Sequence, residues 1–427
     1  MPQTSGLNET SGLKWLFLDL NSYFASVEQQ LNPELRGRPV AVTPVMADTT
    51  CAIAASYEAK AFGIETGTPI YQARKLCPDL RLVVARHDLY VRFHHRIVEE
   101  IEDHIPITKV CSIDEVACEL LGAERARANV IALAQRIKRG LAENVGVCLR
   151  CSIGVAPNRF LAKVATGLQK PDGLVLIEPR DLPERLLGLD LRDLPGIGAS
   201  MERRLRAAGI FDLAALWSIT PRHARRIWNS VVGESFWYAL HGVELPEPPT
   251  TRRSVGHSHV LAPRLRAVDQ ARLVARRLAV KAASRLRRMG YVAAMLCLGV
   301  RLTNGGRWKG AFRVGHADDN SAFLNGLERL WREMLIQCGA VPIKRVSVLL
   351  DDLIRASDVT PDLFAARPDG GPGERLRQER LSLAMDSLNR RYGRDTVVLG
   401  ALPNPEANFV GTKVAFTRIP DLAEFYE

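Results

Sequence analysis

The sequence contains no apolar run close to the roughly 20 residues that a membrane-spanning helix needs. Its first residues, MPQTSGLNETSGLK, have neither the basic start nor the apolar stretch of a secretion signal. The eight cysteines form no disulfide framework, and the single C-x-x-C of Cys148 and Cys151 has no second pair or histidine at zinc spacing. These absences argue against a membrane, secreted or zinc-binding protein and predict a cytoplasmic one.

What the sequence does contain is an uneven distribution of positive charge. Residues 251–350 include 19 Lys/Arg and 5 Asp/Glu and therefore carry +14, whereas the rest of the chain carries −3 of the total of +11. One basic segment of this kind favours a polyanion such as DNA as the partner, although a solvated basic surface would give the same count.

The order of predicted elements indicates an α+β protein of several domains. Residues 15–20, WLFLDL, form a short apolar strand, an amphipathic helix is predicted over 88–103 and another helix over 124–144, an order typical of an antiparallel sheet backed by two helices. Short helices follow from about residue 181. After the proline-rich linker GVELPEPPT, residues 254–350 have the order strand, helix, two strands, helix, strand.

Three acidic residues lie in apolar strands. Asp19 is near the end of WLFLDL, and Asp114 and Glu115 lie within the apolar stretch 110–120. Carboxylates in such strands are costly unless something compensates their charge. Because neighbouring strands lie only ~5 Å apart, the acids can face one point, where two hard cations ~4 Å apart would suit nucleotidyl transfer. The alternative is that these acids cap turns or pair with arginines.

Three further residues are candidates for contacts with a triphosphate. Tyr57 and Lys60 lie one helical turn apart after a predicted strand, and Lys163 lies in the helix that follows residues 152–158. A phenol and two ammonium groups suit phosphate oxygens. Each residue alone is more typical of an ordinary surface position, so this prediction depends on their being close together.

Two features suit contacts with a DNA backbone. Gly196 and Gly198, in LPGIG between two short helices, let N–H groups approach phosphate oxygens as in a helix-hairpin-helix motif, with a plain turn as the alternative. The basic segment also places cations on or beside predicted strands, where phosphate contacts would be independent of sequence and sensitive to salt. These cations are Arg252, Arg253, Arg301, Arg307, Lys309, Arg313, Lys344 and Arg345. Four others, Arg277, Lys281, Arg285 and Arg288, line one face of a helix and are expected to be solvated.

Five stretches, in order and at suitable spacing, resemble the Y-family of translesion DNA polymerases (DinB/UmuC superfamily, ImpB/MucB/SamB type). They are FLDLNSYFASVEQQLNPELRGRPVAV, SYEAKAFGIETGTPIYQARKLCPDL, CSIDE, SIGVAPNRFLAKVATGLQKPDG and DLPGIG. The resemblance implies a right-hand polymerase with a ferredoxin-like palm (1–30 and 87–180), small fingers (31–86), a helix-hairpin-helix thumb (181–243), a linker (244–253), a βαββαβ little finger (254–353) and a C-terminal tail (354–427).

The resemblance also implies an activity and roles for single residues. The activity is low-fidelity, template-directed DNA synthesis past damaged bases, in the SOS response and DNA repair. Primer-template DNA and deoxynucleotides are the implied partners. Two Mg²⁺ ions, for which Mn²⁺ can substitute, would be held by Asp19, Asp114, Glu115 and the Leu20 carbonyl. Phe24 would be the steric gate, whose ring clashes with a ribose 2′-hydroxyl, and Tyr57, Lys60 and Lys163 would hold the triphosphate.

The chain departs from the family pattern at some positions. Lys60 stands where the family usually has Arg, which keeps the charge but loses the two-pronged geometry. Thr166-Gly167 replaces a usual Ser-Asp pair. After the little finger, TPDLF resembles a weak peptide for binding the replication sliding clamp, with Leu363 and Phe364 as its contacts, although an amphipathic linker is the alternative. We expect a monomer associated with the bacterial nucleoid.

Two other functions remain open at this point. A non-catalytic DNA-binding scaffold of the same family is one, although such relatives typically lose the metal carboxylates. Another palm-type nucleotidyl enzyme, such as a nucleotide cyclase, is the second. It would explain the acids but neither LPGIG nor the +14 segment.

Overall fold

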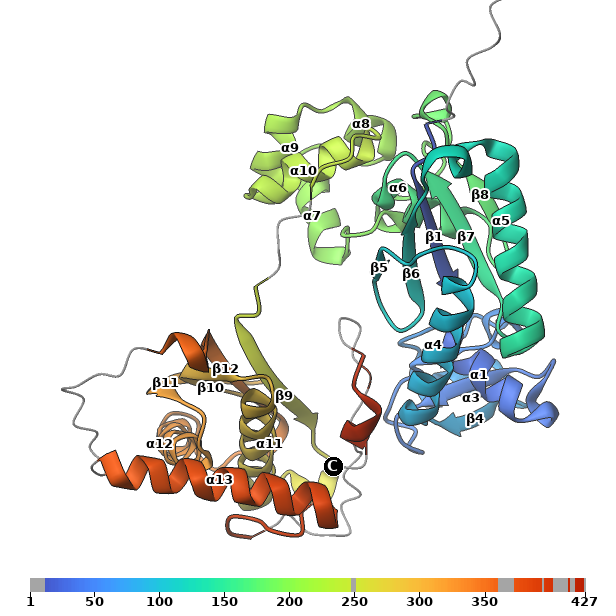
Figure 1. Ribbon diagram of the computed structural model, residues 1–427. Coiled ribbons are helices and arrows are strands. Elements are labelled where there is room, and N and C mark those ends of the chain that lie inside the picture. The colour runs from blue at the N-terminus through green and yellow to red at the C-terminus, as the bar shows by residue number, and fades with distance from the viewer. Residues whose placement is uncertain are drawn as a thin grey trace, which may run out of the picture. The chain divides into compact units, whose positions relative to one another are not determined.

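The structure is a computed structural model, and the chain forms two compact units (Figure 1). Unit 1 comprises residues 1–247 and 412–425, and unit 2 comprises residues 248–411 and 426–427. The structure describes residues 12–246, 251–359, 372–393, 395–401, 414 and 419–425. Within these ranges, no helix is both long and apolar enough to cross a membrane. Helices and strands are mixed in both units, which confirms the predicted α+β class.

The centre of unit 1 is a five-stranded sheet with the strand order β5-β6-β1-β7-β8. β1 pairs antiparallel with β6 on one side and with β7 on the other. The two strand regions that carry the predicted acids are therefore neighbours. The strands are β1 (Trp15–Leu20), β5 (Lys109–Val110), β6 (Glu115–Glu119), β7 (Cys151–Ala156) and β8 (Leu174–Leu176).

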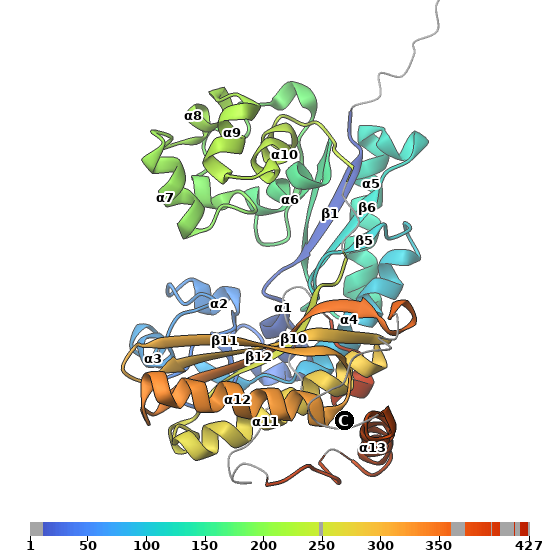
Figure 2. The same ribbon diagram turned by 90° about the vertical axis from the view of Figure 1, so that its left-hand side faces the viewer.

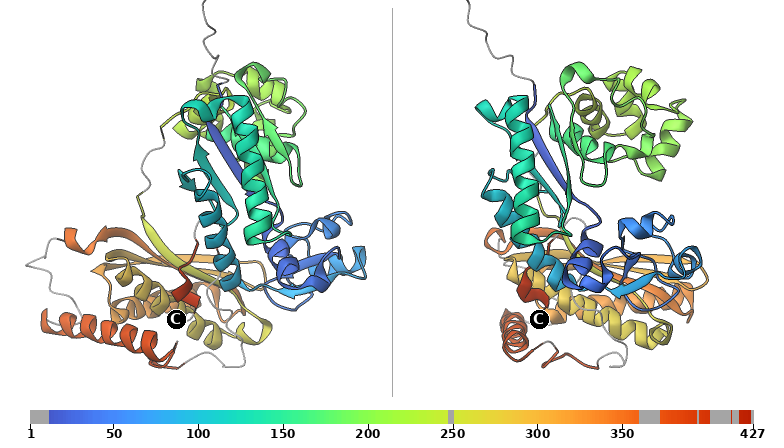
Figure 3. Two further views of the ribbon diagram at one scale, coloured as in Figure 1. Left: turned by 45° about the vertical axis from the view of Figure 1, so that its right-hand side comes forward. Right: turned by 90° about the vertical axis from the view of Figure 1, so that its right-hand side faces the viewer.

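Side chains of β1 alternate between two cores on opposite faces of this sheet. Leu16 and Leu18 pack in a core shared with α1, α4 and α5, whereas Trp15 and Phe17 pack in a core shared with α6. Figure 3 shows the long helices α4 and α5 lying along one side of the sheet. The bounds are α1 (Tyr23–Leu31), α4 (His87–Glu102), α5 (Arg127–Gly140) and α6 (Arg159–Leu168).

Two smaller parts complete unit 1. A three-stranded sheet of order β3-β2-β4 has its own small core, and four short helices share the core of α6. The first part contains β2 (Val40–Thr43), β3 (Ala54–Ala55), α2 (Tyr57–Lys60), α3 (Ile70–Leu76) and β4 (Arg81–Val84). The second contains α7 (Ala199–Ala207), α8 (Leu213–Ser218), α9 (Pro221–Trp228) and α10 (Val231–Leu240).

Unit 2 is built on a four-stranded antiparallel sheet of order β11-β10-β12-β9. The chain order is β9, α11, β10, β11, α12 and β12, so the predicted βαββαβ pattern is confirmed. Both long helices cover one face of the sheet (Figure 2). The bounds are β9 (Ser254–Val260), α11 (Val268–Arg288), β10 (Tyr291–Leu302), β11 (Arg307–Ala317), α12 (Asn320–Cys338) and β12 (Ile343–Arg355).

One expectation about α11 is wrong for Arg277, one of the four cations expected to be solvated. Its side chain is only 17 % exposed, because Asp395, which follows α13 (Pro372–Tyr392), supplies an acidic partner. Arg277 pairs with Asp395, and Arg287 pairs with Asp386 of α13 at 2.8 Å. The Arg287 side chain is only 3 % exposed, so the pairing belongs to a packed interface rather than to a free surface.

Candidate active site

The three predicted acids meet at one end of β1. Asp19 lies directly opposite Glu115 in the antiparallel β1–β6 pair, so both side chains leave the same face of the sheet. The Leu20 N–H donates to the Asp114 carbonyl oxygen at 2.8 Å, which holds Asp114 at the same end. Like charges directly opposite each other destabilise a sheet. The arrangement is therefore costly unless positive charge is supplied there.

Two lysines supply part of that charge. Lys170 Nζ lies 2.8 Å from Asp19 Oδ2, and Lys163 Nζ lies 2.7 Å from Glu115 Oε2. Asp114 has a neutral partner instead, because Ser112 Oγ donates to its Oδ1. A divalent ion that bound between the acids would have to compete with both ammonium groups.

Burial raises the pKa of both aspartates above the ordinary value. For Asp19 the loss of water is the largest cause; the ammonium of Lys170 opposes it, and the charge of Glu115 adds to it. For Asp114 desolvation again comes first, opposed by the hydrogen bond from Ser112 and increased by the charges of Asp19 and Glu115. The site thus holds negative charges together in a poorly hydrated place, which added cations would stabilise.

The donor set fits hard divalent ions, although it is not arranged as a finished metal site. Among the residues that the structure describes, no three His, Cys, Asp or Glu side chains form a group that could hold an ion. Asp19 and Glu115 pair with lysines instead. Carboxylate oxygens are nevertheless the ligands that Mg²⁺ prefers, and ammonium groups beside them mark where positive charge is already favourable.

The raised pKa of Asp114 makes a prediction about stability. We expect Asp114→Asn to raise the melting temperature at pH 8, because the amide removes a charge that burial disfavours. The pKa of the folded state lies above that of the unfolded state, so the penalty is present above the folded pKa and disappears as pH falls through it. Calorimetry at pH 8 and near pH 4 should therefore show the gain shrinking at acid pH; a gain that is constant with pH would contradict this origin.

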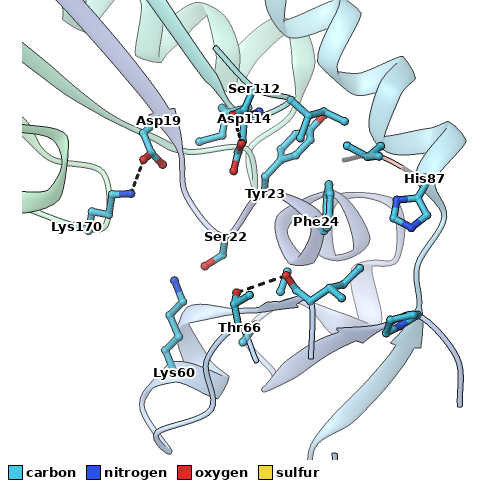
Figure 4. A pocket seen from close by; sticks show the side chains of 17 residues that line it. Asp19, Ser22, Tyr23, Phe24, Lys60, Thr66, His87, Ser112, Asp114 and Lys170 are labelled. Atoms are coloured by element: carbon cyan, nitrogen blue, oxygen red, sulfur yellow. Dashed lines mark hydrogen bonds and ion pairs between the residues drawn. The ribbon is translucent and has the colours of Figure 1, made fainter. Parts of the chain in front are cut away.

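A cavity of about 380 Å³ opens beside the acids. Figure 4 shows Asp19, Asp114, Lys60 and Lys170 around one side of it and Phe24 with His87 at the other. The apolar part of its lining also includes Pro44, Ile53, Ala54 and Ala55. The cavity thus has a charged end and an apolar end, as a nucleotide does.

The predicted phosphate-binding residues are placed unequally. Lys60 lines the cavity, and its Nζ lies 4.5 Å from the centre of the Tyr57 ring. Loss of water and the charge of Lys170 lower the pKa of Lys60, which means that an anion beside it would be favourable. Lys163, in contrast, is engaged with Glu115 and is not part of the lining.

Sequence reasoning missed several lining residues, among them Lys170 and Ser22. Lys170 follows the end of α6 and turns back to Asp19, so only the folded chain shows that it, rather than the helical Lys163, reaches the cavity. Ser22 lies at the start of α1 in a left-handed conformation (φ 49°), and its buried Oγ has no hydrogen-bond partner within the described parts of the chain. A buried hydroxyl without a partner is costly, and an oxygen-rich ligand would satisfy it.

Phe24 occupies the apolar end of the cavity. Its ring stacks on the Tyr90 ring with centroids 4.3 Å apart and planes 14° apart, and it meets the His87 ring edge-on at 5.9 Å. Tyr90 is itself fixed, because its hydroxyl donates to the buried carboxylate of Glu28 at 2.7 Å. The Phe24 ring is therefore a rigid wall that a ligand sugar would meet.

The predicted DNA-binding cations also gather in space. Register places Arg301 opposite both Arg307 and Arg345, so these side chains share the sheet face that α11 and α12 leave uncovered. Lys309 and Arg313 have the same orientation on β11, whereas Lys344 sits at the irregularity in the β10–β12 pairing. Arg252 and Arg253 precede β9 and are exposed.

In unit 1, Gly196 has the positive φ of 94° that favours glycine, and Gly198 caps α7. Ile197 between them is buried and anchors the turn. Open space surrounds the Cα positions of both glycines, so a phosphate could approach their backbone. The predicted clamp contacts Leu363 and Phe364 lie outside the described residues.

Comparison with known sequences gives consistent results. Residues 18–167 match the impB/mucB/samB family, and residues 252–363 match the C-terminal domain of that family. The DNA polymerase IV of Moorella thermoacetica is 33% identical over 394 residues, which cover 90% of this chain and 94% of that protein. DNA polymerase IV of Pelotomaculum thermopropionicum is 31% identical, again over 90% of this chain and 94% of the relative.

Solved structures show the same likeness. A Y-family DNA polymerase chimera of Dbh and Dpo4 aligns with a TM-score of 0.68 and 26% identity, covering 80% of this chain and 99% of that chain. The insertion ternary complex of Dbh DNA polymerase aligns with a TM-score of 0.54, also at 26% identity and with the same coverage.

Proposed function

The chain belongs to the impB/mucB/samB family of Y-family DNA polymerases, and we propose that it is a low-fidelity, template-directed DNA polymerase that copies past damaged bases. The observation that carries this proposal is the meeting of Asp19, Asp114 and Glu115 at one end of β1, beside a cavity with a charged and an apolar end. The partners would be primer-template DNA and a deoxynucleotide.

The catalytic roles follow from the positions of the side chains. Asp19, Asp114, Glu115 and the Leu20 carbonyl would hold two divalent ions, with Mg²⁺ as the expected species, which would supply Lewis-acid activation of the primer 3′-hydroxyl and neutralise the leaving pyrophosphate. Lys60, Lys170 and the Ser22 hydroxyl would bind the triphosphate at the charged end of the cavity. Tyr57 and Lys163 would act from just outside the lining, and Phe24 would exclude ribose.

Two rival functions make different predictions. A non-catalytic scaffold would bind DNA but extend no primer, and the presence of all three acids argues against it. A nucleotide cyclase would use the acids without DNA. That function would leave the uncovered basic face of unit 2 and the glycine turn before α7 unexplained.

The decisive experiment is primer extension with Mg²⁺ on an undamaged template and on one with an abasic site, each with and without a sliding clamp. We expect extension on both templates, and we expect the clamp to increase it if Leu363 and Phe364 bind there. A parallel assay for cyclic nucleotides from the same preparation should be negative. Cyclisation without DNA-dependent incorporation would refute the polymerase proposal.

The basic sheet face predicts how DNA affinity depends on salt. We expect Arg307→Ala combined with Arg345→Ala to weaken binding of any duplex sequence alike and to reduce the slope of log K against log salt by about 2, roughly one for each lost phosphate contact. Binding is measured by fluorescence anisotropy between 50 and 300 mM salt. Arg332→Ala, which removes one exposed positive charge on the helical side of unit 2, is the control and should leave the slope unchanged.

Other parts of the proposal rest on the family likeness. The domain division is the one expected from the sequence, with the five-stranded sheet as palm, residues 31–86 as fingers, 181–243 as thumb and 254–353 as little finger. Because the substrate would be chromosomal DNA, the enzyme would act at the nucleoid in the cytoplasm, and we expect it to be a monomer.

A further inference from the structure

The C-terminal end of the described chain reaches the nucleotide cavity. Apart from Val414, all residues that line the cavity belong to residues 19–170. Val414 joins this lining from more than 240 positions further along the chain. In Figure 4 a short piece of ribbon in the faint red of the C-terminal segment passes beside Phe24 and His87, at the apolar end.

The same segment is anchored to unit 1 by apolar contacts. Ile419, Leu422 and Phe425 pack against the core that also holds α1 and α4, and Pro420 is buried. The short helix Leu422–Phe425 contacts α4, which carries the His87 and Tyr90 rings that support Phe24. Val414 and residues 419–425 therefore belong to the compact unit that contains the acids.

From this placement we propose that Val414 is a specificity-determining residue, which forms the wall of the cavity on the Phe24 side and contacts the sugar or base of the incoming nucleotide. The proposal rests on the polymerase function above. The Val414 side chain is apolar and has no donor, acceptor or charge, so it can take no part in phosphoryl transfer itself. Its contribution should appear in nucleotide binding and sugar choice rather than in the rate of the chemical step.

The test compares four variants in single-nucleotide insertion. Deletion of residues 412–427 and Val414→Gly both remove the wall, whereas Leu422→Ala combined with Phe425→Ala loosens its anchor without touching the cavity. Leu383→Ala, an exposed apolar residue of α13 in unit 2, is the control. We expect the first three to raise KM for the deoxynucleotide by about tenfold, the effect of losing a small apolar contact in a pocket, and to reduce discrimination against ribonucleotides, while kcat stays within twofold. The control should match the wild type in every measurement.

Three results would overturn the proposal. Unchanged KM and sugar discrimination in both Val414→Gly and the deletion would show that the segment does not contact the nucleotide. A rise in kcat/KM on deletion would show that it blocks the cavity instead. If all three variants had a similarly lower kcat and a similarly lower melting temperature, the segment would be only a structural support.

Failure of the polymerase function would look different. In that case the wild type itself extends no primer. A fluorescence titration with deoxynucleotide alone then still compares the affinities of the wild type and Val414→Gly. Equal affinities would show, independently of the reaction, that Val414 does not contact the nucleotide.

Discussion

Asp114→Asn is expected to lower primer extension by about a thousandfold or more, because the metal-dependent part of nucleotidyl transfer contributes several kcal/mol to the barrier. The amide keeps the size of the side chain and can still accept the hydrogen bond from Ser112 Oγ. It removes one of the negative charges that meet at the end of β1. The measurement is single-turnover incorporation with Mg²⁺ on an undamaged template.

The matched control for Asp114→Asn is Glu119→Gln, at the far end of the strand that begins directly after Asp114, where it lies opposite Trp15 and away from the acids. It should retain nearly all the activity. Because Asp114→Asn is also expected to be more stable than the wild type, inactivity through misfolding can be recognised by its melting temperature. Equal activity of Asp114→Asn and the wild type would remove the basis of the two-metal proposal.

Phe24→Ala is expected to reduce discrimination between deoxyribonucleotides and ribonucleotides by roughly 100-fold, because under the proposed function a steric clash with the ring, rather than a hydrogen bond, would select against the 2′-hydroxyl. The Phe24 ring cannot turn aside easily, since it stacks on Tyr90 and contacts His87. The ratio of kcat/KM for the two sugars, measured opposite one template base, gives the result.

Phe160→Ala is the control for Phe24→Ala. Phe160 is a partly buried phenylalanine of α6 that packs against Phe236 and does not line the cavity. It should destabilise the protein while leaving the sugar ratio unchanged. An unchanged ratio in Phe24→Ala itself would show that another wall of the cavity excludes ribose.

Much of the fold could be predicted because its signals are local. The alternation and length of apolar runs identify strands such as Trp15–Leu20, and spacing of about four identifies α4, whose apolar residues face the core. The βαββαβ order of unit 2 follows from the same periodicities. The ion pair between Arg287 of α11 and Asp386 of α13 could not be predicted in this way, because the arginines of α11 look solvated until a separate helix supplies Asp386.

Some residues of the candidate site could likewise be predicted from local sequence, whereas others could not. Asp19, Asp114 and Glu115 stand out in the sequence, since a carboxylate in an apolar strand is costly and needs a reason to be there. Lys170, Ser22 and Val414 carry no such signal. A lysine after a helix, a serine in a turn and a valine near the C-terminus are ordinary in any sequence, and their proximity to the acids depends on how distant segments pack.

The sequence by itself determined the family, the fold class, the three acids and the basic segment, because each depends on the chemistry and spacing of residues close together in the chain. Only the tertiary structure decided that Lys170 rather than Lys163 lines the cavity, that five of the cations share one sheet face, and that Val414 belongs to the cavity lining. The physical reason is that contacts between distant segments are set by strand register and core packing, which single positions in a sequence do not encode.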